Sequence, residues 1–373
     1  MGLVANRRRR PMSTFHATAL ESAFADWRAQ AAPKQADAFT DTEPPVMVAY
    51  GGGVDSTAML IELIESGFHI DVVLFADTGS EKPATYAFVE LFGEWLRARG
   101  VRFEVVRYEP RNFKNFPPYH SLDENCFTNG TLPSISFGFS SCSQKWKIEP
   151  QNRWAEAWPR AQATWRASGK IIKLIGYDCS PADAKRYAHR EGYDDPRYVY
   201  GYPLRTLGWV RQDCEDRIAA AGLPVPPKSA CFMCAATKPW ELHTFPVELL
   251  RRIVLMEARA EPRLQKIEGL WRNGVKGTRG GQPRPGRMTD YIRAEGLLPS
   301  AEVDAIRAAA PGALVAWQHA QADVPIAARP ALAEWLAMFD MRSSADFDAP
   351  GGPAYFSSLD AAVAAWPVSA PCH

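Results

Sequence analysis

The sequence contains no apolar run that could cross a membrane. A membrane-spanning helix needs about 18 or more consecutive apolar residues, and the longest candidate runs, 58–64 and 312–317, are far shorter. No apolar segment follows the four arginines at 7–10, as it would in a signal peptide. We therefore expect a cytoplasmic protein with no membrane contact.

The chain also lacks an excess of charge of either sign. It has 43 Lys and Arg against 42 Asp and Glu, for a formal net charge of +1. Bulk charge therefore gives no argument for binding to nucleic acid or to a membrane. The arginines at 7–10 could contact nucleic acid, but a solvated tail is the more common role of such a run.

Cysteine is present in an odd number, seven, with no secretion signal. This pattern argues against a disulfide framework and for reduced thiols that are free for metal or redox chemistry.

Strand and helix patterns alternate over the first two thirds of the 373 residues. This alternation predicts an α/β fold with a doubly wound, mostly parallel sheet. The expected strands are 46–50, 71–75, 101–108 and 171–175, the expected helices are 55–65, 83–99 and 144–158, and 109–143 reads as a long loop. We expect three parts: an N-terminal tail with a peripheral helix (1–40, helix at 15–30), a sheet domain (41–240) and a helical C-terminal region (241–373).

A glycine-rich turn separates the first expected strand from its helix. It reads Gly51-Gly52-Gly53-Val54-Asp55-Ser56, with Thr57 after it. Backbone N–H groups at a helix N-terminus form a ready site for phosphate, and glycine lets the anion approach closely. The spacing is neither that of a Walker loop nor Gly-x-Gly-x-x-Gly. The alternative is a structural turn in which the aspartate caps the helix.

Further motifs follow in a fixed order. After the second strand come Asp77, Thr78 and Gly79, and then Thr85. The later segments are Cys142 with Lys147, Ile148 and Pro150; Gly176-Tyr177 with Asp183 and Arg186; and Tyr202-Pro203-Leu204 with Trp209 and Asp213.

Together these segments, over about 45–240, resemble the PP-loop ATP pyrophosphatase superfamily and its phosphoadenylyl-sulfate (PAPS) reductase branch. The chain departs from that pattern at Gly51, which replaces the first serine, at Tyr177, and in the spacing of the last segment. The resemblance implies an adenine nucleotide alpha hydrolase-like fold that binds ATP with Mg²⁺. It also implies catalytic roles for Asp55, Ser56, Lys147 and Arg186, and nucleotide contacts from Gly51, Gly52, Gly53, Val54, Asp55, Ser56, Thr57, Asp77, Thr78 and Gly79.

Cys231 and Cys234 form a CxxC pair that, with Cys142, favours a metal centre. In the related adenylyl-sulfate reductases, a Cys-Cys pair and a distant CxxC hold a [4Fe–4S] cluster, but Ser143 stands here in the second position. Our choice of fourth ligand is Cys214, with Cys126 and Cys179 as weaker candidates. Structural zinc on the same residues and simple reduced core thiols remain open. Cys372 is a candidate attacking thiol, although the reductases' tail motif is missing.

The function we expect is sulfur transfer by a nucleotide-dependent enzyme. It would adenylylate an acceptor, such as a nucleic acid, for thiolation, with a sulfur donor such as a cysteine desulfurase. Two alternatives are a reductase of adenylyl sulfate or PAPS and a non-catalytic nucleotide-binding protein.

Overall fold

The computed structural model of the chain describes residues 14–33, 43–111, 117–133, 135–136, 139–277, 283–310, 323–325, 328 and 331–337. Within these ranges no helix has the length and apolar character needed to cross a lipid bilayer.

A five-stranded parallel sheet forms the centre of the molecule. Its strand order is β3-β2-β1-β6-β7, and Ala49 in β1 pairs with Leu74 in β2 and with Ile175 in β6. The strands are β1 (Val46–Tyr50), β2 (Val72–Asp77), β3 (Phe103–Arg107), β6 (Ile171–Ile175) and β7 (Tyr198–Gly201). The α/β class and the parallel sheet predicted from the sequence are thus confirmed.

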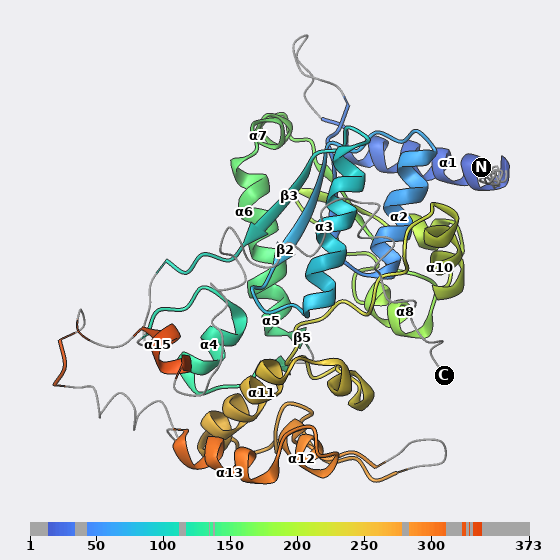
Figure 1. The fold of residues 1–373 in the computed structure, drawn as a ribbon. Helices are drawn as coiled ribbons and strands as arrows, with labels where there is room; N and C mark the ends of the chain where they lie inside the picture. The colour runs from blue at the N-terminus through green and yellow to red at the C-terminus, as the bar shows by residue number, and fades with distance from the viewer. Residues whose placement is uncertain are drawn as a thin grey trace, which may run out of the picture.

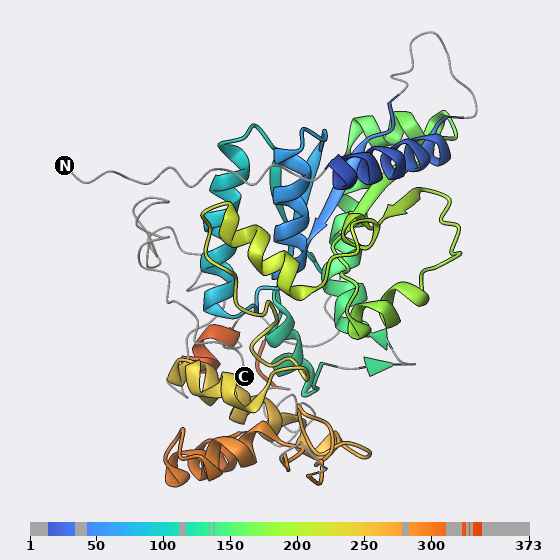
Figure 2. The ribbon, with the colours of Figure 1, turned by 90° about the vertical axis from the view of Figure 1, so that its right-hand side faces the viewer.

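Helices cover both faces of the sheet, and this is why the strands read as continuous apolar runs (Figures 1 and 2). One face carries α1 (Thr14–Ala31), α2 (Val54–Glu65), α3 (Pro83–Arg97) and α10 (Arg211–Ala220). The other carries α6 (Glu149–Ala157) and α7 (Pro159–Arg166). The helix expected at 15–30 is α1, which buries Leu20, Phe24 and Ala31 against the sheet.

The expected loop at 109–143 contains ordered elements, so that prediction was wrong. It includes α4 (Leu122–Asn129), β4 (Ile135–Ser136) and β5 (Phe139–Ser140). Helix α4 begins with a capping box in which Ser121 and Glu124 bind each other's backbone N–H. The Ser-x-x-Glu signature of this box is visible in the sequence, but the short apolar pattern after it hid the helix.

A C-terminal group of helices lies beyond the carboxyl ends of the strands (Figure 1). Trp146, Phe127 and Phe232 belong to the same hydrophobic core as these helices, so residue 240 does not separate the two cores. The C-terminal group contains α11 (Val247–Ala260), η3 (Glu261–Arg263), α12 (Met288–Ala294), α13 (Ser300–Ala309) and α15 (Leu332–Ala337). The other elements in the described ranges are α5 (Ser141–Ser143), the π-helical η1 (Gln144–Ile148), α8 (Pro181–Ala188), α9 (Pro203–Thr206) and η2 (Pro239–Thr244).

Candidate functional site

The carboxyl ends of β1 and β6 form the crevice where an open α/β sheet binds its ligand. The neighbours of β1 are β2 on one side and β6 on the other, so the chain reverses its winding direction there. The turn after β6 lies directly against the first turn of α2. A Cβ added at Gly176 would come within 2.8 Å of the Ser56 backbone, which only glycine permits.

The glycine-rich turn after β1 has the shape that the sequence predicts. Gly52 has a φ of +69°, and a Cβ there would meet the Val89 side chain at 2.9 Å. The Gly53 carbonyl accepts hydrogen bonds from the Thr57 amide at 3.1 Å and from the Thr57 hydroxyl at 2.8 Å. Thr57 is fully buried, so its hydroxyl stabilises the turn. The Gly51 N–H donates to the Ser56 hydroxyl at 3.2 Å.

Asp55 faces two further carboxylates and two arginines at this crevice. Burial raises its pKa to about 6, Asp178 and Asp183 add to the increase, and Arg211 and Arg186 oppose it. Arg211 pairs with Asp55 at 3.2 Å, and Arg186 pairs with Asp183 at 2.9 Å. The carboxylates give a cation an oxygen-rich surface, and the arginines can neutralise phosphate.

The turn after β2 is held by its own hydrogen bonds. The Asp77 carboxylate accepts from the Gly79 amide at 2.8 Å, from the Tyr86 hydroxyl at 2.8 Å and from Arg107 at 2.9 Å. Gly79 has a φ of +69° and lies against Ser121. Both Asp77 and Thr78 are buried. The sequence predicts nucleotide contacts for these three residues, and the structure gives them bonds that shape the turn.

The CxxC segment docks on this turn after β2. Cys231 forms a β-bridge with Glu81, and its Sγ lies 3.2 Å from the Thr78 hydroxyl. Lys147 reaches the same place from η1, with its Nζ 2.9 Å from Glu81 Oε1. Burial lowers the Lys147 pKa, but Glu81, Cys231 and Cys234 together raise it above its usual value. Lys147 therefore stays protonated beside the thiols.

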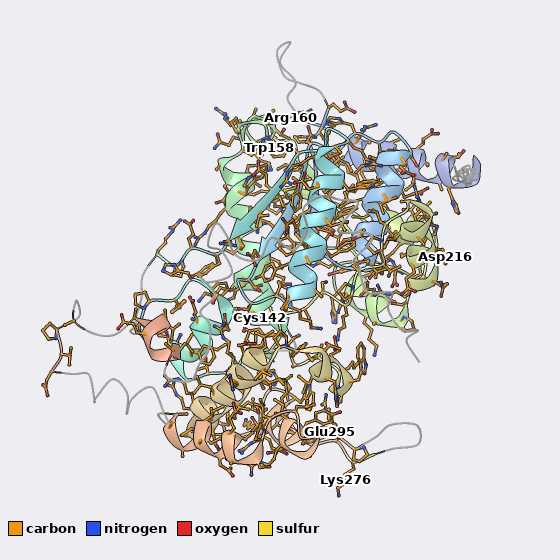
Figure 3. The ribbon with its side chains drawn as sticks, viewed as in Figure 1. Cys142, Trp158, Arg160, Asp216, Lys276 and Glu295 are labelled. Carbon is orange, nitrogen blue, oxygen red and sulfur yellow. The ribbon has the colours of Figure 1, made fainter. Side chains whose placement is uncertain are left out.

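Three of the four predicted metal ligands are neighbours, and the fourth lies apart. Burial raises the pKa of Cys142, and Cys234 raises it further. Cys234 also interacts with Cys231. Cys214 is buried in the other hydrophobic core, where burial raises its pKa, Asp55, Asp178 and Asp213 raise it further, and Arg211 opposes them. Figure 3 shows Cys142 between the sheet and the C-terminal helices.

Cys126 is the additional thiol in this neighbourhood, because its pKa responds to Cys142. Among the described residues, no three or more His, Cys, Asp or Glu side chains are arranged to hold a metal ion. The thiols thus match a soft metal in kind, but the structure does not assemble a four-ligand site. The remaining candidate, Cys372, lies outside the described residues.

Residue 229 connects the two turns. A Cβ on Gly53 would meet the Ser229 hydroxyl oxygen at 2.8 Å, so the segment that leads to Cys231 lies against the glycine-rich turn after β1. The Phe232 amide then donates to the Ser80 carbonyl at 3.0 Å. One short segment therefore contacts the turns after β1 and β2.

Sequence reasoning missed Glu81, Asp178 and Arg211. Glu81 and Asp178 each follow a strand by a few residues, so their position at the carboxyl edge could have been inferred. Arg211 begins α10, and only the packing of α10 on α2 brings it to Asp55.

No protein-family model and no curated protein matches this sequence. Among solved structures, the chain is similar to the U34-tRNA thiolase NcsA from Methanococcus maripaludis with its [4Fe-4S] cluster. The alignment covers 76% of this chain and 91% of that chain, with 12% sequence identity and a TM-score of 0.33. At this sequence identity and TM-score, the similarity does not establish a family or a function for this chain.

Proposed function

We propose that this chain is a PP-loop enzyme that uses ATP to adenylylate an acceptor and then supports sulfur transfer to it. The observation that carries the proposal is the segment 229–231, which contacts the glycine-rich turn through Ser229 and the Glu81 turn through Cys231. The glycine-rich turn and a set of thiols are thereby neighbours at the carboxyl ends of the strands.

In this proposal the N–H groups of the turn at 51–54 bind the phosphates of ATP at the N-terminus of α2. Mg²⁺ usually binds one or two carboxylates together with substrate phosphates, so Asp55 would hold the ion jointly with ATP. Arg186 and Arg211 would stabilise negative charge that develops on the phosphates. An acceptor oxygen attacks the α-phosphorus, pyrophosphate leaves, and a sulfur nucleophile then displaces AMP.

The motif order supports a PAPS reductase-like PP-loop protein within this proposal. A nucleic acid is the proposed acceptor, and a cysteine desulfurase is a suitable class of sulfur donor. We further propose that Cys142, Cys231 and Cys234 bind a metal centre, with a [4Fe–4S] cluster favoured over zinc. These residues supply three of the four cysteine ligands that such a cluster normally has.

ATP turnover tests the nucleotide part of the proposal. Release of pyrophosphate from Mg-ATP should fall at least about 100-fold in Asp55→Asn, because a charge that positions the cation is lost. The matched control is Asp216→Asn on the exposed side of α10 (labelled in Figure 3), which should keep full activity. Unchanged turnover in Asp55→Asn would refute the assignment of the turn.

Metal analysis of anaerobically purified protein tests the thiol part. We expect about four irons with matching acid-labile sulfide per chain, and loss of both in Cys231→Ala but not in Cys179→Ala. Cys126→Ala then tests whether Cys126 is the fourth ligand, whereas Cys214→Ala should keep the metal because Cys214 lies in the other hydrophobic core. One zinc per chain would indicate a structural site, and no metal would reject the proposed centre.

A further inference from the structure

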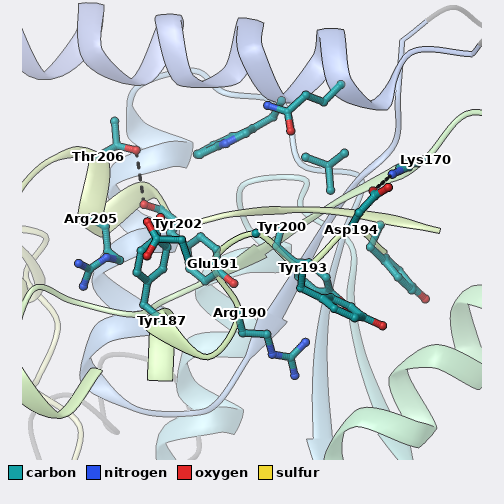
Figure 4. A pocket seen from close by; sticks show the side chains of 15 residues that line it. Lys170, Tyr187, Arg190, Glu191, Tyr193, Asp194, Tyr200, Tyr202, Arg205 and Thr206 are labelled. Carbon is teal, nitrogen blue, oxygen red and sulfur yellow. Dashed lines mark hydrogen bonds and ion pairs between the residues drawn. The ribbon is translucent and has the colours of Figure 1, made fainter. Parts of the chain in front are cut away.

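A cavity of about 740 Å³ lies beside the free edge of β7, outside the crevice described above (Figure 4). Trp27 and Gln30 of α1 form one wall, and residues 190–194, which follow α8, form another. Tyrosine dominates the lining, with Tyr187, Tyr193, Tyr198, Tyr200 and Tyr202. Among them Tyr193 is 59% exposed, so its ring is open to a ligand that stacks on it.

Two of these tyrosines carry hydroxyl groups that are closed to solvent and have no hydrogen-bond partner among the described residues. They are Tyr198, which is only 5% exposed, and Tyr202. By contrast, the Tyr200 hydroxyl donates to Asp195 at 3.0 Å. An unsatisfied buried hydroxyl is costly and uncommon in folded proteins. Because these two oxygens have no surface open to solvent, a ligand in the cavity would contact the tyrosine rings and not these hydroxyl groups.

The cavity also presents a cation that is not neutralised by a described residue. The Arg190 guanidinium lies 5.4 Å from the centre of the Tyr200 ring and makes no ion pair with any residue in the described ranges. The other cations are already engaged. Lys170 pairs with Asp194, and Arg205 donates to the Asp178 carbonyl at 2.9 Å.

The cavity and the crevice share one loop. Tyr202 stacks on Tyr177 with ring centres 5.7 Å apart and planes at 22°, and Tyr177 directly follows Gly176 at the crevice. Arg205 holds the next residue, Asp178, from the cavity side. A ligand in the cavity would therefore end close to the nucleotide-binding crevice.

We propose that this cavity binds an unpaired nucleotide of a single-stranded nucleic-acid acceptor. A tyrosine face can stack on an exposed base, and an arginine can pair with the backbone phosphate. The assignment of this nucleic acid as the acceptor depends on the proposed function, but binding at the cavity does not. A free adenine nucleotide shares the same chemistry and is distinguished by the test.

Fluorescence anisotropy of the full-length protein with a labelled single-stranded RNA of about ten nucleotides, long enough to fill a typical single-strand site, tests the proposal. The variant Tyr193→Ala removes the exposed ring of the lining. It should raise the dissociation constant about tenfold through lost stacking, and Arg190→Gln should have a similar effect. Tyr200→Phe is the matched control, because its hydroxyl is already bound to Asp195, and it should change the affinity less than about threefold.

Several results would overturn the proposal. They are an absence of RNA binding, equal affinity in the wild type and in Tyr193→Ala and Arg190→Gln, and a loss confined to ATP binding, which would assign the cavity to the free nucleotide. Asp55→Asn separates the two proposals: it should abolish pyrophosphate release and leave RNA affinity unchanged.

Discussion

At the scale of single residues, Asp55 is the most informative side chain. It lies in the first turn of α2, where a carboxylate is normally favoured by the helix dipole. Burial and two neighbouring carboxylates outweigh that benefit and raise its pKa to about 6. The ionised carboxylate of Asp55 is therefore destabilised in the folded protein, and a bound cation would stabilise it.

This pKa predicts a pH dependence of both activity and stability. The carboxylate must be ionised to bind a cation, so pyrophosphate release should fall by half near pH 6 and continue to fall toward pH 5. The folded protein holds this proton more tightly than the unfolded chain, whose value is near 3.8, so the ionised form costs stability above pH 6. Asp55→Asn should therefore raise the free energy of unfolding at pH 8, by on the order of 1–3 kcal/mol.

Urea unfolding at pH 8 and at pH 4 measures this difference, which should shrink toward the lower pH. Asp216→Asn, which alters an exposed carboxyl group, should show no such change. A constant difference at both pH values would mean that Asp55 has no raised pKa.

At the scale of elements, the turns after β1 and β2 form the candidate site, and each is packed against a segment from elsewhere in the chain. Ser229 lies on the first turn at Gly53, and Ser121, which caps α4, lies on the second at Gly79. The π-helical η1 carries Lys147 to the second turn. Such helix irregularities are frequent at functional sites.

Gly79→Ala tests how tightly the second turn is packed. Two effects add, because the residue has a φ of +69° and its new Cβ would come within 2.5 Å of the Ser121 Cβ. We expect a loss of about 2–4 kcal/mol in the free energy of unfolding, measured by urea denaturation. The matched control is Gly67→Ala, where φ is +81° but no atom lies within 4 Å, so only the backbone cost of about 1–2 kcal/mol applies. Equal losses would show that the close contact does not exist.

At the scale of the whole molecule, a buried ion pair joins the sheet domain to the C-terminal helices. Arg252 of α11 pairs with Asp123 of α4, and both side chains are almost completely buried. The Asp123 carboxylate also accepts from the Ser80 hydroxyl at 2.6 Å, in the turn after β2. The C-terminal helices therefore support the same turn that carries Cys231.

Arg252→Met should destabilise the protein by about 3–5 kcal/mol, because it leaves the Asp123 charge buried without a partner. Adding Asp123→Asn should recover part of that loss, and a double-mutant cycle in urea measures the coupling. The control is Arg293→Met at an exposed pair with Asp304, expected to cost less than about 1 kcal/mol. Additive losses at Arg252 and Asp123 would contradict a direct interaction.

The sequence by itself determined the α/β class, the parallel sheet and the glycine-rich turn. Strand and helix periods are local, and Gly52 is required by a local backbone conformation, so short stretches suffice to predict them. The helix α4 was also encoded locally, in the Ser121–Glu124 capping box, but its short apolar pattern concealed it.

Only the tertiary structure decided which distant residues meet. Cys214 is near Cys231 in the sequence, yet it packs into the core beside Asp55, whereas Cys126 and Cys142 lie in the neighbourhood of the CxxC segment. The sequence likewise did not predict that the hydroxyl groups of Tyr198 and Tyr202 are buried without a hydrogen-bond partner among the described residues. The physical reason is that packing and burial depend on contacts between segments far apart in the chain, which no local pattern records.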